Sequence, residues 1–132
     1  TDTDSNTLFH YACMNSKNES IIRLLLNHDK MLINALNEEK ETPLHIACAF
    51  NVNKQIIEFL LENGAMVNAV QRDMVTPLHQ ACRYHFDEDI ITLLLEYQAD
   101  IHALDVVHST PLHIACQYNS NEKIVLCLLK NH

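Results

Sequence analysis

Histidine and cysteine recur together four times along the 132-residue chain, always three positions apart. The pairs are His10/Cys13, His45/Cys48, His79/Cys82 and His113/Cys116. Residues at this spacing share one face of a helix, so each pair could supply two of the four ligands of a zinc site. A cysteine can also serve as a nucleophile, provided that it is exposed and a base lies within reach.

The distances between the pairs argue against both chemistries. The four cysteines lie 35, 34 and 34 residues apart and each directly follows an alanine, so we expect them at equivalent positions of successive structural units. Pairs repeated along a stack do not converge on one metal ion. We therefore expect buried cysteines and histidines that hydrogen-bond to backbone in a neighbouring turn. The sequence predicts no catalytic residue, no cofactor and no metal site.

The other reactive groups are equally weak candidates. Cys127 lies in the apolar stripe of the last predicted helix, where we expect core packing with partial exposure because the stack stops there. The single glycine excludes a glycine-rich phosphate loop, and we interpret the acidic pairs Glu38/Glu39 and Asp87/Asp89 as solvated or helix-capping groups. Five cysteines are an odd number, and we expect them to stay reduced in an intracellular protein, in cytoplasm or nucleus.

Each pair belongs to a longer block that begins with threonine. The blocks are Thr42-Pro43-Leu44-His45-Ile46-Ala47-Cys48, its counterparts at 76–82 and 110–116, and a weaker copy at 7–13. Threonine caps a helix well and proline suits the first helical position, so each block predicts a short helix. Eleven residues after each threonine, a second cap precedes a run of aliphatic residues that predicts another helix; these caps are Asn18, Asn53, Asp87 and Asn121.

These blocks resemble the T-P-L-H-x-A signature of ankyrin repeats. Val67-Asn68-Ala69 and Ile101-His102-Ala103 resemble the V-N-A segment that leads into the family's β-hairpin finger. The resemblance covers the whole chain in four units, about 2–36, 37–70, 71–104 and 105–132. It implies a single domain over 1–132, an all-α repeat solenoid of helix-turn-helix units with β-hairpin-like finger loops. Because the chain starts at Thr1, we expect it to be a fragment of a longer protein.

The chain departs from the family pattern in its glycines. It has one glycine, where average usage would give about nine. The family usually places glycine between its helices and near the finger tip; here the tips hold Lys40, Met74 and His108. We expect left-handed asparagines in the longer inter-helix loops, and either left-handed or reshaped tips. One additional residue within 27–33 predicts that the first finger is offset from the others.

The charge indicates the kind of partner. With nine Lys and Arg against seventeen Asp and Glu, the formal charge is −8, which disfavours nucleic acid and anionic membranes. No stretch approaches the roughly 18–20 apolar residues of a membrane span. We therefore expect no nucleic acid and no membrane insertion, and a monomer that binds a protein or peptide with some basic character.

The residues that follow each Ala-Cys pair should point into the concave face of the solenoid. Phe50, Tyr84 and Tyr118 are 34 residues apart, so stacking should align them as an aromatic ladder beside Arg83 and Gln117. Aromatic residues and arginine dominate binding hot spots. The alternative is that each ring only covers the turn of its own unit.

The finger tips are the second predicted contact surface. They change from acidic (Glu38, Glu39) through mixed (Arg72, Met74) to apolar (Val106, Val107). The pattern predicts a ligand with basic anchors toward the first finger and apolar anchors toward the last two, unless the apolar tips tuck onto neighbouring fingers.

Two functions remain open at this point. The first is a non-catalytic protein-protein interaction module, such as an adaptor, scaffold or inhibitor. The alternative is the substrate-recognition arm of a larger enzyme, channel or host-targeted effector, which would then act inside a host cell.

Overall fold

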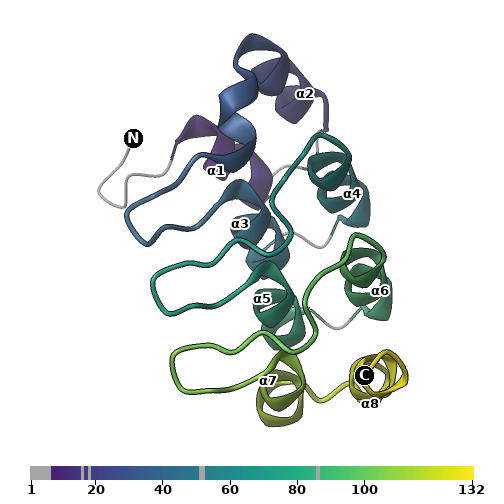
Figure 1. The fold of residues 1–132 in the computed structure, drawn as a ribbon. Helices are drawn as coiled ribbons and strands as arrows, with labels where there is room; N and C mark the ends of the chain where they lie inside the picture. The colour runs from purple at the N-terminus through teal and green to yellow at the C-terminus, as the bar shows by residue number, and fades with distance from the viewer. Residues whose placement is uncertain (1–6, 16, 18, 51–52, 86) are drawn as a thin grey trace.

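The computed structural model describes residues 7–15, 17, 19–50, 53–85 and 87–132, which form four helix pairs stacked along one direction (Figure 1). The elements are α1 (Leu8–Asn15), α2 (Glu19–His28), the 3₁₀ helix η1 (Lys30–Asn34), α3 (Pro43–Phe50), α4 (Lys54–Glu62), α5 (Pro77–Tyr84), α6 (Glu88–Glu96), α7 (Pro111–Tyr118) and α8 (Glu122–Lys130). The odd-numbered helices lie between the finger loops and the even-numbered helices. The predicted all-α repeat solenoid is confirmed.

The helices begin where the caps predict. The Thr76 and Thr110 side chains each accept the backbone N–H three residues on, and proline occupies the first turn. Asn53, Asp87 and Asn121 cap α4, α6 and α8 through their side-chain oxygens. The fourth predicted second-helix cap, at position 18, lies outside the described residues.

The core is continuous across the four helix pairs. On α3 and α5 it contains the leucine, alanine and cysteine of the block, as in Leu44, Ala47 and Cys48, all fully buried. The even-numbered helices add their aliphatic stripe, including Ile57 and Leu94. Neither helix of a unit could bury its apolar face alone, so stacking supplies the stability of the fold.

Three finger loops, at 37–41, 71–75 and 105–109, share the same backbone hydrogen bonds. In the first finger the Asn37 N–H donates to Glu41 O and the Lys40 N–H donates to Asn37 O, and the same bonds recur 34 and 68 residues later. Adjacent fingers are joined as well: Arg72 N–H donates to Glu39 O, and Val106 N–H donates to Asp73 O. The fingers are hairpin-like turns, without a strand in the described part of the chain.

Each finger tip adopts the left-handed backbone without glycine. The φ angles are 61° at Lys40, 58° at Met74 and 62° at His108. The C-terminal ends of α4 and α6 show the same conformation, at Gly64 (φ 91°) and at its counterpart Gln98 (φ 67°). A left-handed conformation costs a residue with a Cβ atom roughly 1–2 kcal/mol, so these tips carry local strain.

Met74→Gly is therefore expected to stabilise the fold by about 0.5–1 kcal/mol, the left-handed penalty less the entropy that glycine adds to the unfolded chain. Met66→Gly is a matched control, because Met66 is similarly exposed (58% against 51%) but is not among the residues with positive φ. It should destabilise the protein by a similar amount. Urea denaturation measures the change in the free energy of unfolding for each variant. If both substitutions stabilised the protein, backbone strain at Met74 would be excluded as the cause of its stabilisation.

Two expectations about loops were wrong. The first finger is in register with the others, because the additional residue of the first unit is absorbed in η1, which Asp29 caps. Asn119, in the last inter-helix loop, is extended rather than left-handed (φ −108°). Its side-chain amide instead donates to the carbonyls of Cys82 and His85 in the preceding unit. The loop positions 51 and 52 lie outside the described residues.

Candidate functional site

Three of the four block histidines use both ring nitrogens within the fold. His79 Nδ1 accepts the Thr76 backbone N–H (3.2 Å), so the neutral ring carries its proton on Nε2. Nε2 then donates to Ser109 O at 3.0 Å, in the finger of the next unit. His10 and His45 make the same bridges, to Glu41 O and Val75 O. The predicted bonds to neighbouring backbone are confirmed for these three histidines.

The buried block residues are consequently unsuited to acid-base or nucleophilic chemistry. Burial lowers the pKa of the His45 imidazole to about 4, so the ring is neutral near pH 7. Burial likewise raises the pKa of the Cys13 thiol to about 12 and raises that of Cys48 and Cys82 further. In the described part of the chain, no three His, Cys, Asp or Glu side chains gather where a metal ion could bind.

The last unit differs from the others at both members of its pair. Cys116 is exposed, contrary to the prediction, and His113 is exposed as well. His113 keeps its bonds to Thr110 but bridges to no finger within the described residues. The physical reason is that α7 packs against a stacked neighbour, α5, on one side only, whereas α3 and α5 are each covered on both.

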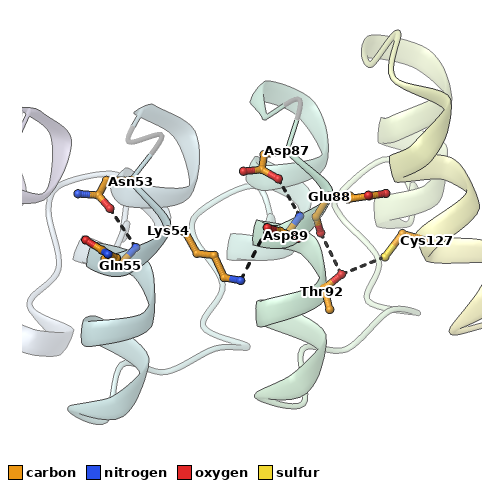
Figure 2. A network of polar contacts seen from close by, with 8 residues as sticks. All are labelled: Asn53, Lys54, Gln55, Asp87, Glu88, Asp89, Thr92 and Cys127. Carbon is orange, nitrogen blue, oxygen red and sulfur yellow. Dashed lines mark hydrogen bonds and ion pairs between the residues drawn. The ribbon is translucent and has the colours of Figure 1, made fainter.

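Polar contacts join neighbouring even-numbered helices, at the N-terminal ends of α4 and α6 and in the middle of α6 and α8 (Figure 2). Lys54 of α4 approaches Asp89 of α6 at 4.0 Å, an exposed ion pair that adds little stability. Thr92 donates to Glu88 O and lies 3.6 Å from the Cys127 sulfur of α8. Cys127 is half-buried against the core, as predicted. This surface is therefore a set of structural contacts between helices.

The three predicted ladder residues occupy equivalent positions at the ends of α3, α5 and α7. They are exposed to 58% (Phe50), 47% (Tyr84) and 47% (Tyr118). The Phe50 and Tyr84 rings stack, with centroids 6.4 Å apart and an angle of 17° between their planes. An arginine lies between the Tyr84 and Tyr118 rings. The Arg83 guanidinium is 4.4 Å from the Tyr118 ring centroid and 5.3 Å from that of Tyr84.

A hollow of about 250 Å³ lies between the first finger and the last turns of α1 and α3. Its polar wall contains Glu38, Glu39 and Glu41, and its apolar surface contains Met14, Ile46 and Phe50. Glu41 accepts the side-chain amide of Asn37, and Glu39 lies 3.8 Å from Arg72 of the second finger. No basic residue lines this first groove among the described residues.

A larger hollow of about 390 Å³ lies between the third finger and α7. Its apolar lining includes Val75, Val106, Val107, Ile114 and Tyr118, and Gln117 lies at its edge. Asp73, Asp105 and Arg83 also line it, so acidic and basic groups are nearly balanced. The Asp105 carboxylate is occupied by the backbone N–H groups of Val107 and Ser109.

The apolar side chains of the finger tips are largely exposed. Met74, Val106 and Val107 are exposed to 51%, 52% and 73%, so they are not tucked onto adjacent fingers. Arg72 is exposed beside Glu39. The structure thus gathers the predicted residues on one surface, formed by the fingers and the odd-numbered helices, and their role in binding stays a prediction.

Sequence reasoning missed the residues beneath the ladder. Ile46 and Ile114 line the two grooves one helical turn before Phe50 and Tyr118. Side chains four residues apart share a helix face, so extending the ladder positions back by four would have found both. The contact of Arg83 with the next unit's ring has no such signal in the sequence.

A comparison with protein-family models matches nearly all of the described structure. The family model described as "Ankyrin repeats (3 copies)" matches residues 1–71 and again residues 69–132. The two matches together span the four helix pairs. The longest described helix, α2, has ten residues, and none of the described helices could cross a membrane.

Proposed function

The chain belongs to the ankyrin-repeat family, and on that premise we propose that it is a non-catalytic module that binds a partner protein between its fingers and odd-numbered helices. Ankyrin repeats are generally protein-protein interaction modules. The predicted contact residues are Phe50, Arg83, Tyr84, Gln117 and Tyr118 on the helices, with Glu38, Glu39, Arg72, Met74, Val106 and Val107 on the fingers.

The exposed aromatic ladder is the observation that supports this proposal most strongly. Two rings are stacked and nearly parallel, and Arg83 continues the row to Tyr118, yet all three rings stay about half exposed. Rings that only covered the turn of their own unit would be more deeply buried than these three are. Aromatic residues and arginine are the side chains that most often carry binding energy.

The rigidity of this surface also supports the proposal. The ladder residues stand on helices packed on a shared core, and finger-to-finger hydrogen bonds hold the loops in line. Little side-chain or loop entropy is then lost on binding. The acidic first groove and the apolar third finger favour a partner with a basic anchor at one end and apolar anchors at the other. We propose that this binding takes place inside a cell, by a monomer.

Phe50→Ala/Tyr84→Ala/Tyr118→Ala is expected to weaken partner binding by at least tenfold, because truncating even one central hot spot costs about 2 kcal/mol. Affinity capture followed by titration of the recovered partner measures the loss. Leu24→Ala/Leu126→Ala/Leu129→Ala is the matched control, since these exposed leucines lie on α2 and α8. Thermal melts show whether both variants stay folded. A folded ladder variant that binds as tightly as the wild type would exclude this surface.

A further inference from the structure

We infer that the partner contacts this surface through one extended segment that carries an arginine and a large apolar residue about six positions apart. The inference rests on the proposed function and specifies its ligand. The arginine would occupy the first groove, beneath the finger at 37–41, and the apolar residue the groove beneath the finger at 105–109.

The first groove has the chemistry of an arginine site. Three glutamates line it, and no basic side chain does so among the described residues. The exposed Phe50 ring and the Met14 and Ile46 side chains form its apolar surface. A guanidinium can stack on an aromatic ring while it donates to carboxylates, and its aliphatic stem can pack on apolar side chains. Lysine matches this combination less well, because its ammonium lacks the planar fork.

The groove beneath the third finger selects a different side chain. Here Arg83 offsets the acidic groups, and the Asp105 carboxylate already accepts two backbone N–H groups. The exposed surface that remains is branched and aromatic, with Val106, Val107 and Tyr118 around a volume of about 390 Å³. A leucine, isoleucine or phenylalanine would bury apolar area against these side chains.

The spacing of the two anchors in the peptide follows from the distance between the stacked units. The two grooves are two units apart, and packed helices lie roughly 8–10 Å from one another, so their separation is about 16–20 Å. An extended chain advances about 3.3 Å per residue, which places the two anchors five to six residues apart. Between them the segment would cross the Phe50–Tyr84 stack.

Arg72 lies beside the first groove and affects how strongly the groove can bind an arginine. It lies 3.8 Å from Glu39, with both side chains more than half exposed, and therefore competes with a bound arginine for that carboxylate. Arg72→Gln removes the competitor while the backbone N–H of residue 72 can still donate to Glu39 O. We expect this variant to bind an arginine-containing peptide about two- to fivefold more tightly, the scale of one exposed ion pair.

The test begins with a displayed library of random 12-residue peptides, from which binders to the full 132-residue chain are selected. The selected sequences are then synthesised, and their affinities are measured by fluorescence anisotropy. The inference expects selected sequences in which arginine and an apolar residue are five or six positions apart. Glu38→Lys/Glu39→Lys should lower the affinity for these peptides at least tenfold. Glu62→Lys, on the exposed side of α4, is the charge-matched control and should change affinity less than twofold.

The outcomes separate this inference from the proposed function. Peptides that bind the ladder but lack arginine, or that tolerate any spacing, overturn the inference and leave the proposed function standing. An unchanged or weaker affinity of Arg72→Gln for arginine peptides overturns the assignment of the first groove. If no selected peptide responds to the triple ladder substitution, or if none is selected at all, both proposals fail together.

Discussion

Lowering the pH from 7 to 5 is expected to remove about 2 kcal/mol of stability through His45 alone, and about 3 kcal/mol by pH 4. Burial lowers the pKa of His45 to about 4 in the folded protein, below the 6.5 of an unperturbed imidazole. The unfolded chain therefore takes up a proton through pH 6.5 while the folded chain resists it. Stability is lost as the pH falls through this window.

Three further histidines contribute in the same direction. Burial also lowers the pKa of His10, His79 and His85. His85 is buried with no hydrogen-bond partner for its Nε2 among the described residues, so a charged ring is poorly accommodated there. Because a domain of this size is typically stable by only about 5–15 kcal/mol, these contributions add to a loss through His45 that is already a substantial fraction of the total.

Urea denaturation at pH 7, 6 and 5, with NMR titration of the histidine ring signals, measures this dependence. His45→Gln should flatten the slope, since an amide can form hydrogen bonds without titrating. His113→Gln is the control for the substitution itself, because His113 occupies the same position of the last block with an exposed ring. A folded-state pKa above 6 for His45 would contradict the prediction.

His79→Ala is expected to cost about 3 kcal/mol, whereas His113→Ala should cost about 1 kcal/mol or less. The two residues occupy the same position of the same block and make the same bonds to the preceding threonine. Only His79 is buried and bridges to Ser109 O of the next finger. Its removal leaves a cavity and a carbonyl without its donor.

The difference between these two variants separates the local helix cap from the packing and the hydrogen bond that His79 makes with the next unit. Equilibrium denaturation gives both free energies of unfolding, and the comparison needs no assumption about the value of a single hydrogen bond. Equal losses in the two variants would mean that the cap, present in both blocks, carries the whole effect. In that case the contact with Ser109 would contribute nothing measurable.

The features that the sequence predicted well depend on local chemistry. Thr76 and Asn53 cap helices through bonds within three residues, and the 34-residue period aligns Phe50 with Tyr84. The predictions that failed depend on neighbouring units. Cys116 was expected to be buried by analogy with Cys82, but analogy between repeats holds only where both neighbours exist. Asn119 was expected to turn left-handed, yet its amide binds carbonyls more than thirty residues away.

In the candidate site, too, the features set by the repeat were predicted and those that depend on a neighbouring unit were not. Periodicity identified which residues share the surface, because equivalent positions of a solenoid line up. It could not place the Arg83 guanidinium between two rings, since the conformation of a long side chain depends on the unit beside it. Nor could it predict that Glu39 and Arg72, on successive fingers, lie within reach of each other.

The bridges from His10, His45 and His79 each span about thirty residues and always run from one unit to the finger of the next. An in-frame duplication of residues 71–104 would therefore let each copy of His79 bridge to the finger that follows it, while the junction between the two copies would be a new interface. Such a duplication adds one aromatic position and one finger, and it moves the acidic and apolar ends of the surface about one helix diameter further apart. Copying a unit would thus change the length of segment that the protein can read while leaving the chemistry at each end intact.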